Sequence, residues 1–126
     1  MRKCLVTAAA TAMTVSIAFA QTAPTKVGDS AKGKVLTDQK GMTLYTYDKD
    51  ADGKSVCNGP CAANWPPLMA SADAKADGSY AVITRDDGSR QWTYKGKPLY
   101  TWVKDTKPGD VNGDGVANNA WHAAMP

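Results

Sequence analysis

An internal repeat is the feature of this sequence that most constrains its fold. When Gly41 is placed over Gly96, the run Leu44-Tyr45-Thr46-Tyr47 lies over Leu99-Tyr100-Thr101-Trp102, and Lys49-Asp50 lies over Lys104-Asp105. After a one-residue insertion near Pro108 the match resumes, with Gly53 over Gly109, Trp65 over Trp121 and Met69 over Met125. A shared register over this length predicts one domain made of two divergent copies of the same unit.

Each unit is predicted to begin with a β-hairpin. Its two strands flank a glycine-containing turn, at Gln39-Lys40-Gly41 in the first unit and at Lys95-Gly96-Lys97 in the second. Pro66-Pro67 stops one expected helical turn. The expected strands are residues 34–38, 42–48, 80–85, 90–94, 98–103 and 120–125, and the expected helical turn is residues 61–65.

The composition agrees with a fold of strands and turns. All 12 acidic residues are aspartate, which favours turns over helix interiors, and 11 glycines and 7 prolines act in the same direction. We therefore predict a mainly β protein, a small antiparallel sheet domain with at most one short helix. Within the domain at residues 34–126 we place repeat one at about 34–69, a linker with an extra strand at about 70–88, and repeat two at about 89–126.

The N-terminus has the pattern of a secretory signal peptide over residues 1–20. Arg2 and Lys3 precede an apolar stretch that closes on Ala18-Phe19-Ala20, so we expect cleavage after Ala20 and a periplasmic or secreted mature protein. Residues 21–33 are predicted to be a flexible leader. No other apolar run is long enough for a transmembrane segment. Removing 2 of the 15 basic side chains leaves 13 against 12 acidic ones, which gives no electrostatic basis for binding nucleic acid.

Two cysteines remain after the signal peptide, because Cys4 lies within it. Cys57 and Cys61 flank a turn-forming Asn-Gly-Pro insert, and outside the cytoplasm such a pair is most simply a disulfide. Redox-active pairs are usually spaced C-x-x-C, one residue closer. Two thiolates together with His122 would instead suit copper or zinc. We predict a structural disulfide, and a thiol-redox pair or a metal site at Cys57, Cys61 and His122 is the alternative.

Two aspartate-rich runs, residues 48–53 and 110–115, resemble the start of a calcium-binding loop. The EF-hand pattern needs a bidentate Glu at position 12, where this chain has Gly59 and Trp121. We therefore interpret both runs as turns. Because no nucleophile motif is present either, we expect neither catalysis nor a resident cofactor, with copper or zinc as the alternative.

A set of seven aromatic side chains has two interpretations. Alternate residues of a strand share a face, so Tyr45 and Tyr47 point together, as do Tyr100 and Trp102. The set either packs in the core or forms an exposed stacking surface for a sugar or peptide of the cell envelope. We predict the core, with Tyr45 and Tyr100 at equivalent buried positions. The seven residues are Tyr45, Tyr47, Trp65, Trp92, Tyr100, Trp102 and Trp121.

The pattern Y-x-[FWY]-x-x-D occurs twice, as Tyr45, Tyr47 and Asp50 and as Tyr100, Trp102 and Asp105. Two further blocks are Cys57 and Cys61 followed by Trp65-Pro66-Pro67-Leu68, and Pro108-Gly109-Asp110 leading to Ala120-Trp121-His122. Together these motifs resemble the bacterial family called secreted repeat of unknown function, whose members are often described as predicted lipoproteins. The resemblance implies an extracytoplasmic, repeat-built, mainly β domain and implies no reaction. Ala20 stands where a lipid-attachment cysteine would be, so no lipid anchor is predicted.

These observations lead to one functional hypothesis and one alternative. We hypothesise an exported, non-catalytic binding or structural module that contacts an unidentified ligand or protein of the cell envelope. The alternative is a copper, zinc or thiol-redox protein that uses Cys57, Cys61 and His122. The candidate motif residues are Tyr45, Tyr47, Asp50, Trp65, Tyr100, Trp102, Asp105 and Trp121.

Overall fold

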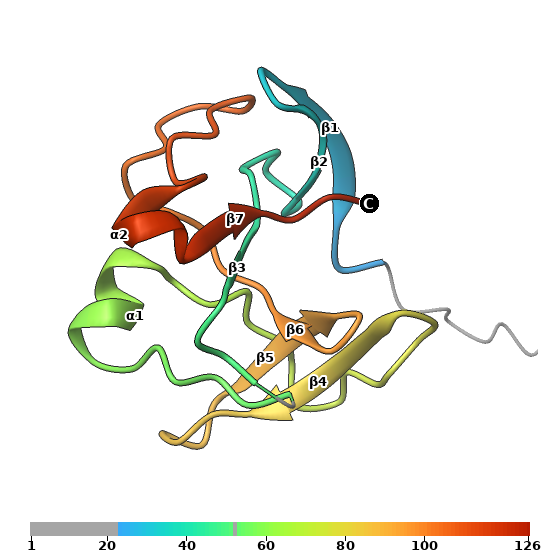
Figure 1. Ribbon diagram of the computed structural model, residues 1–126. Coiled ribbons are helices and arrows are strands. Elements are labelled where there is room, and N and C mark those ends of the chain that lie inside the picture. Colours follow the sequence, from blue (N-terminus) through green and yellow to red (C-terminus); the bar gives the residue numbers. More distant parts are fainter. Residues whose placement is uncertain (1–22, 52) are drawn as a thin grey trace, which may run out of the picture.

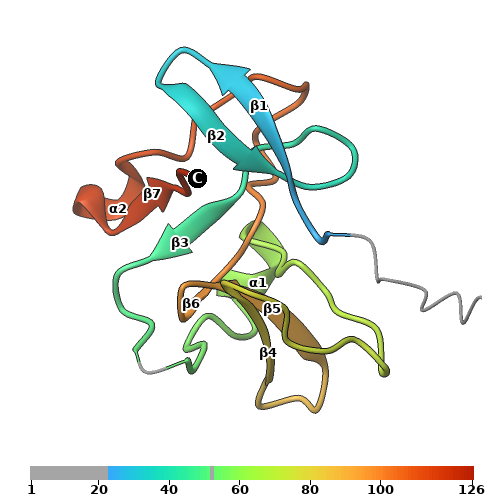
Figure 2. The ribbon, with the colours of Figure 1, turned by 90° about the vertical axis from the view of Figure 1, so that its right-hand side faces the viewer.

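The computed structural model describes residues 23–51 and 53–126, so the predicted signal peptide lies outside the described residues. The described chain is mainly β, as predicted, and within it the strands form three small antiparallel sheets (Figure 1). The elements are β1 (Lys26–Ser30), β2 (Gly33–Thr37), β3 (Tyr45–Tyr47), α1 (Pro60–Asn64), β4 (Tyr80–Thr84), β5 (Arg90–Tyr94), β6 (Lys97–Pro98), α2 (Val116–Asn119) and β7 (Trp121–Ala123). The β1–β2 ribbon and the β4-β5-β6 sheet lie at opposite ends of the molecule, with β3 and β7 between them (Figure 2).

The two repeats are interleaved at the centre of the molecule. β3 of repeat one pairs with β7 of repeat two, and Tyr45 lies opposite Ala123. In the equivalent place, repeat two takes its partner from repeat one, because the Leu68 N–H donates to the Leu99 carbonyl at 2.9 Å. Each repeat is therefore completed by the end of the other, and the two together form one domain.

A pseudo-twofold axis passes between Tyr45 and Tyr100. The Tyr45 N–H donates to the Tyr100 carbonyl at 2.7 Å, and the Tyr100 N–H returns the bond to Tyr45 at 3.0 Å. Bonds on either side of this pair recur in equivalent places. The bond from the Leu36 N–H to the Ala124 carbonyl is equivalent to the bond from the Trp92 N–H to the Leu68 carbonyl. In the same way, the bond from the Leu44 N–H to the Leu36 carbonyl is equivalent to the bond from the Leu99 N–H to the Trp92 carbonyl. The repeat found in the sequence is thus a repeat of backbone geometry.

The predicted flexible leader is wrong from residue 26 onward. Lys26–Ser30 forms β1, which pairs along its whole length with β2. The sequence pattern missed this strand because its one apolar residue, Val27, is exposed, so that the strand has no buried face to produce alternation. A backbone ladder and an exposed ion pair between Asp29 and Lys34 hold it instead.

The predicted strands that follow the hairpin turns, and the predicted last strand, are found only in part. The run at 42–48 shortens to β3 and the run at 120–125 shortens to β7, whereas the prediction at 98–103 is wrong beyond Pro98, the last residue of β6. Tyr45 and Tyr100 pair with each other as an isolated bridge. At these two positions each repeat therefore pairs with the other repeat, which interrupts its own hairpin. The short helix α2 was not expected from the sequence. Its Ala117 and Asn118 have left-handed backbone angles, with φ of 59° and 57°.

Alternation along β3 divides the core into two parts. Tyr45 faces a cluster that contains Trp65, Tyr100 and Trp121, whereas the neighbouring Leu44 faces a smaller cluster with Leu99. Tyr45, Tyr100, Leu44 and Leu99 are each 0 % exposed. β3 therefore forms a partition with buried aromatic residues on one side and aliphatic residues on the other. Among the described residues, no helix has the length and apolar character needed to cross a membrane.

Candidate functional site

The motif tyrosines bond to the motif aspartates of the opposite repeat. The Tyr45 hydroxyl donates to Asp105 Oδ2 at 2.5 Å, and the Tyr100 hydroxyl donates to Asp50 Oδ2 at 2.6 Å. Both tyrosines are fully buried and Asp105 is nearly so. Each Y-x-[FWY]-x-x-D motif therefore supplies the donor of one bond between the repeats and the acceptor of the other.

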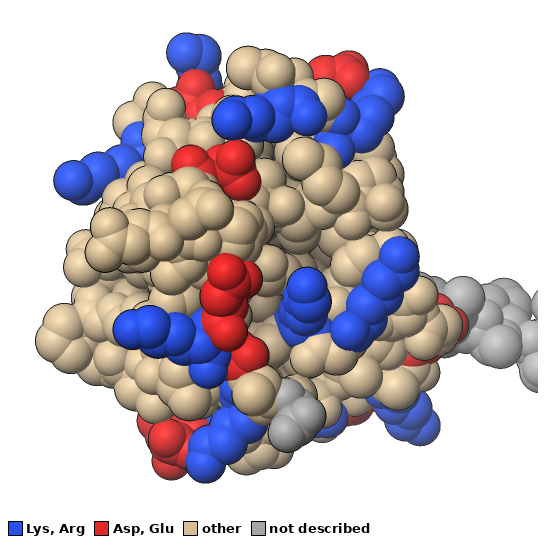
Figure 3. Space-filling view, in the orientation of Figure 1, with Lys and Arg blue, Asp and Glu red and all other residues tan. Residues whose placement is uncertain are grey.

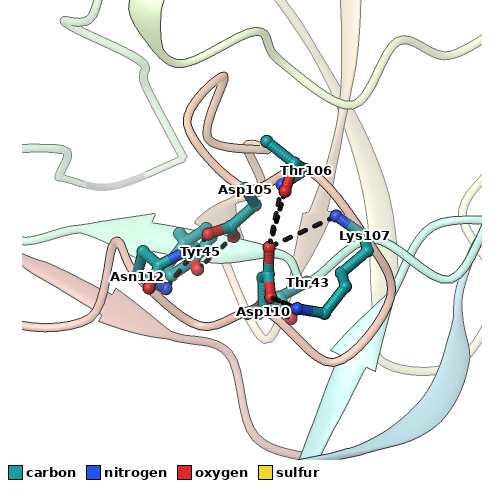
Figure 4. Close-up of polar contacts among 7 residues, drawn as sticks. All are labelled: Thr43, Tyr45, Asp105, Thr106, Lys107, Asp110 and Asn112. Atoms are coloured by element: carbon teal, nitrogen blue, oxygen red, sulfur yellow. Dashed lines mark hydrogen bonds and ion pairs between the residues drawn. The ribbon is translucent and has the colours of Figure 1, made fainter.

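The second oxygen of each motif carboxylate holds the loop that follows it. The Asn112 N–H donates to Asp105 Oδ1 at 3.0 Å (Figure 4), and the Val56 N–H donates to Asp50 Oδ1 at 2.8 Å. Both carboxylates thus accept bonds on both oxygens. Carboxylates bonded in this way connect parts of the fold.

Burial shifts the protonation equilibria of this network. It raises the pKa of the Tyr45 and Tyr100 phenols, and the hydrogen-bonded carboxylates Asp105 and Asp50 raise them further. Burial also raises the pKa of Asp50, although the bonds from Tyr100 and Val56 and the charge of Arg85 oppose that shift. The phenols are therefore neutral hydrogen-bond donors at neutral pH and do not act as bases.

Four aromatic rings stack across the pseudo-twofold axis. Trp65 and Trp121 lie face to face at the axis, with ring centroids 3.7 Å apart and an interplanar angle of 1°. Trp102 stacks on the outer side of Trp65 at 3.9 Å, and Tyr47 stacks on the outer side of Trp121 at 4.1 Å. The two central rings are buried and the outer two are half-buried. As predicted, the aromatic set is mostly core, and it does not form an open stacking surface.

The disulfide belongs to repeat one alone. Cys57 and Cys61 are bonded to each other across the start of α1, and Cys57 is fully buried. In repeat two, Gly113 stands at the position of Cys57, and a Cβ there would lie 2.8 Å from the Trp65 ring. The aromatic packing therefore excludes a cysteine from the second copy.

A buried arginine lies beside the disulfide loop. Arg85 is 5 % exposed, and its guanidinium donates to the Cys57 carbonyl at 2.6 Å, to Ser55 Oγ at 2.9 Å and to Gln91 Oε1 at 2.8 Å. Ser55 Oγ lies 2.5 Å from the Tyr100 hydroxyl. Arg85 thus connects the disulfide loop to β5 and to the motif network. The sequence analysis missed it because no pattern distinguishes a buried arginine from an exposed one.

The structure does not bring the candidate metal ligands together. The two cysteine sulfurs are bonded to each other, and His122 Nε2 lies 2.8 Å from Asp48 Oδ2. Within residues 23–51 and 53–126, no group of three or more His, Cys, Asp or Glu side chains is placed to hold a metal ion. The geometry therefore gives no support to a shared site at Cys57, Cys61 and His122.

The aspartates of the second aspartate-rich run, residues 110–115, hold turns, as predicted. Asp110 Oδ2 accepts bonds from the N–H groups of Thr106 and Lys107 at 2.9 and 3.2 Å, and the Thr43 hydroxyl donates to the Asp110 carbonyl at 2.6 Å (Figure 4). The bond from the Thr106 N–H is the main reason why the pKa of Asp110 is lowered. Asp114 Oδ1 accepts from the Ala123 N–H at 2.8 Å. These carboxylates stabilise loop backbone.

A groove runs along the face of β3 opposite Tyr45. A part of about 280 Å³ lies between β3, β7 and the turn that joins β5 to β6, and a part of about 230 Å³ continues toward the loop after β3. Thr46, Asp48 and Lys97 line both parts, so the groove is continuous. Acidic side chains over β3 and basic ones over β6 face each other across this hollow (Figure 3). The first part is also lined by Tyr94, Lys95, His122, Ala123, Ala124 and Met125.

The pseudo-twofold axis relates part of this groove to part of a second one of about 400 Å³. Leu68, Met69 and the turn at residues 38–40 line it, in the places that Ala124, Met125 and the turn at residues 94–97 occupy in the first groove. Ala23 and Pro24 of the N-terminal segment also line the second groove. In the repeat alignment, Val103 stands opposite Asp48 and Pro66 stands opposite His122. The shared fold therefore does not require the Asp48–His122 pair.

Comparison with known families identifies the repeated unit. The model of a family described as a secreted repeat of unknown function matches residues 26–69 and again residues 81–125. The chain belongs to this family. The first match begins at β1 rather than at residue 34, and the second begins within β4. No curated protein and no solved structure matched the chain.

For this secreted repeat, the family motif marks the bonds that hold two copies together. The predicted site residues Tyr45, Asp50, Tyr100 and Asp105 are assembled at the axis as structural elements. The sequence patterns did not mark Asp48, Lys95 or Lys97 as site residues, although these residues line the groove. A signal for Asp48 was available, because it is a charged residue where the other repeat has an apolar one.

Proposed function

We propose that this protein is an exported, non-catalytic binding module of the cell envelope, and that its ligand occupies the groove along β3. The supporting observation is the difference between the two grooves. Equivalent turns and equivalent residue pairs, Leu68-Met69 and Ala124-Met125, line the two grooves, yet only the groove along β3 is also lined by Asp48 and His122. Polar residues that a fold does not need, gathered in a concave site, are a typical sign of a binding role.

The hydrogen bonds of the core also support this proposal. The tyrosines and aspartates of the repeated sequence motif are hydrogen-bonded to each other across the axis. They give the scaffold rigidity, and among them Asp50 also lines the groove. A rigid, duplicated support with one differentiated groove suits recognition, because a preorganised site loses little entropy when it binds.

The experiment that tests the proposal is a ¹H–¹⁵N NMR titration of the exported protein with soluble peptidoglycan fragments and soluble headgroup glycerophosphodiesters. We expect the amides of residues 46–48, 94–97 and 122–125 to shift, and those of the second groove to remain in place. Asp48→Val combined with His122→Gln should abolish the shifts, whereas Lys40→Ala in the second groove is the matched control. Turnover of any added fragment, or shifts that never involve the groove, would contradict the proposal.

The competing hypothesis is a metal or thiol-redox role for Cys57, Cys61 and His122. Intact mass and metal analysis of the exported protein separate the two. A mass 2 hydrogens below the reduced value, with no metal, agrees with the disulfide in the structure. Free thiols together with near-stoichiometric copper or zinc would overturn the binding-module proposal and place the function in repeat one.

A further inference from the structure

We infer that the ligand of the β3 groove is a small soluble anion, bound through a phosphate or carboxylate group by Lys95 and Lys97. The inference rests on the proposed binding function of this groove and specifies its ligand. Both lysines line the groove, and neither forms an ion pair with any of the described residues. Two ammonium groups that line one hollow and form no ion pair there can attract an oxyanion.

The two carboxylates that line the groove, Asp48 and Asp50, both have hydrogen-bond partners. Asp48, which lines both parts of the groove, has its Oδ2 atom 2.8 Å from His122 Nε2. An incoming cation would compete with this imidazole for Asp48 and would also meet two lysines. The arrangement therefore favours an anion over a cation, and the Asp48–His122 pair fixes the wall opposite the lysines.

The backbone at Lys95 is a second, independent observation. Lys95 has a φ of 51° and Gly96 a φ of 82°, so both residues of the turn between β5 and β6 are left-handed. Such two-residue turns strongly favour Asn, Asp or Gly at the first position, because a side chain with a Cβ is strained there. The Lys95 ammonium lies 5.1 Å from the centroid of the Tyr94 ring, which also lines the groove. An ammonium group held in a groove at the expense of local strain indicates a role in binding.

The size and the remaining lining of the groove limit the ligand. About 280 Å³ is at the small end of ligand sites, and Tyr94, Ala124 and Met125 provide an apolar wall. These features fit a phosphate or carboxylate on a short carbon skeleton. The groove has only one exposed large apolar side chain, Met125, which is too little for insertion into a membrane surface.

The test uses three matched probes, glycerol 3-phosphate, inorganic phosphate and glycerol, in NMR titrations of the exported protein at low salt. We expect both phosphates to shift the amides of residues 94–97 and 122–125, and glycerol to shift none. Lys97→Ala should weaken binding about tenfold or more, since a charge-assisted bond is lost. Lys40→Ala, in the second groove, should leave the affinity unchanged.

Lys95→Gly is the decisive variant, because it removes the ammonium group and also relieves the left-handed strain. We expect it to raise the midpoint of thermal unfolding and at the same time to weaken phosphate binding. A purely structural lysine would show no loss of binding. This pair of readouts therefore separates a ligand-binding lysine from a surface lysine.

Each other outcome has a defined meaning. If glycerol or a neutral peptidoglycan fragment shifts the groove amides and phosphate does not, the binding module stands and the anion inference fails. If no probe shifts the groove, both fail. Equal shifts at lysines over the whole surface, unchanged in Lys97→Ala, would mean charge screening and overturn the inference. Binding to vesicles that contain anionic lipid, without binding to any soluble phosphate, would overturn the inference that the ligand is soluble.

Discussion

The hydroxyl of Tyr45 in repeat one donates a 2.5 Å hydrogen bond to the carboxylate of Asp105 in repeat two. Tyr100 and Asp50 form the reciprocal bond at 2.6 Å. This exchange explains why tyrosine and aspartate occur together in one short motif although they do not bond within it. Each repeat supplies the donor for one bond and the acceptor for the other, so the motif is meaningful only when two copies pack against each other.

Removing the Tyr45 hydroxyl tests the strength of this bond. Tyr45→Phe keeps the ring but leaves Asp105 Oδ2 buried without its donor, so the free energy of unfolding should fall by about 1–3 kcal/mol. Tyr100→Phe should have a similar effect through Asp50. Tyr47→Phe is the matched control, because the described residues give its hydroxyl no hydrogen bond, and it should change stability by less than about 0.5 kcal/mol. Urea unfolding measures all three.

Truncation of the same tyrosines tests their predicted equivalence in the core. Tyr45→Ala and Tyr100→Ala should each lower the free energy of unfolding by about 3–5 kcal/mol, because each ring is fully buried. Chemical denaturation gives the two values directly. Losses below about 1 kcal/mol at both positions would mean that the rings face solvent, and they would then be candidate binding residues.

Alkaline pH should destabilise the fold through these two phenols. Burial raises the pKa of both, so the folded state keeps their protons at pH values where the unfolded chain has lost them. Their contribution is fully present below the unfolded pKa of about 10 and is lost as pH rises above it. Each phenol should add a slope of about −1.4 kcal/mol per pH unit to the free energy of unfolding.

Urea unfolding from pH 8 to pH 11.5 measures this slope. Tyr45→Phe should remove about half of the tyrosine contribution, while the exposed lysines, which are the same in both proteins, cancel in the comparison. Between pH 8 and pH 9 the two proteins should show parallel, nearly flat profiles. An identical alkaline slope in wild type and variant would contradict the assigned burial of the phenol.

The sequence predicts those parts of the fold that leave a local pattern of turns or of alternating apolar residues. The strand at residues 90–94 was predicted with the bounds of β5, because turns delimit it on both sides. The alignment of the repeats also placed Tyr45 and Tyr100 as equivalent. It did not reveal that the repeats exchange partners, since period-2 alternation is the same whichever strand pairs with which.

Other features had no signal within one sequence. β1 is a solvated ribbon with little buried surface, so hydrophobic alternation could not reveal it. The burial of Arg85 depends on how the disulfide loop folds over β5, which is a tertiary contact between distant residues. The groove depends on the distance between β3 and the turn after β5. Only the difference between Asp48 and its counterpart Val103 was visible in advance.

The contrast between Cys57 and Gly113 tests the asymmetry of the repeats. Gly113→Ala should destabilise the protein by about 1–3 kcal/mol, because a Cβ would lie 2.8 Å from the Trp65 ring. At the equivalent position of repeat one a side chain is accommodated, so Cys57→Ala with Cys61→Ala should cost about 2 kcal/mol, the value expected for losing a short cross-link. Reduction of the wild type should reproduce the second loss, and the loss caused by Gly113→Ala should be the same in the oxidised and the reduced protein.

The buried Arg85 gives the last prediction. Arg85→Met keeps most of the side-chain volume but removes the donors to the Cys57 carbonyl and to Gln91, so two buried acceptors lose their partner. The expected loss is about 2–3 kcal/mol in the free energy of unfolding. Hydrogen exchange should also become faster at the amides of residues 55–58, because the guanidinium no longer holds that loop.

Arg90→Met is the control for this change. Arg90 donates to the carbonyls of Ser71 and Ala72 at the surface, where water can replace it, so the loss should be smaller, at about 1 kcal/mol or less. It should leave exchange at residues 55–58 unaltered. If Arg85→Met proves as mild as Arg90→Met, the guanidinium is not a structural connection. The rigidity of the disulfide loop must then come from the Cys57–Cys61 bond alone.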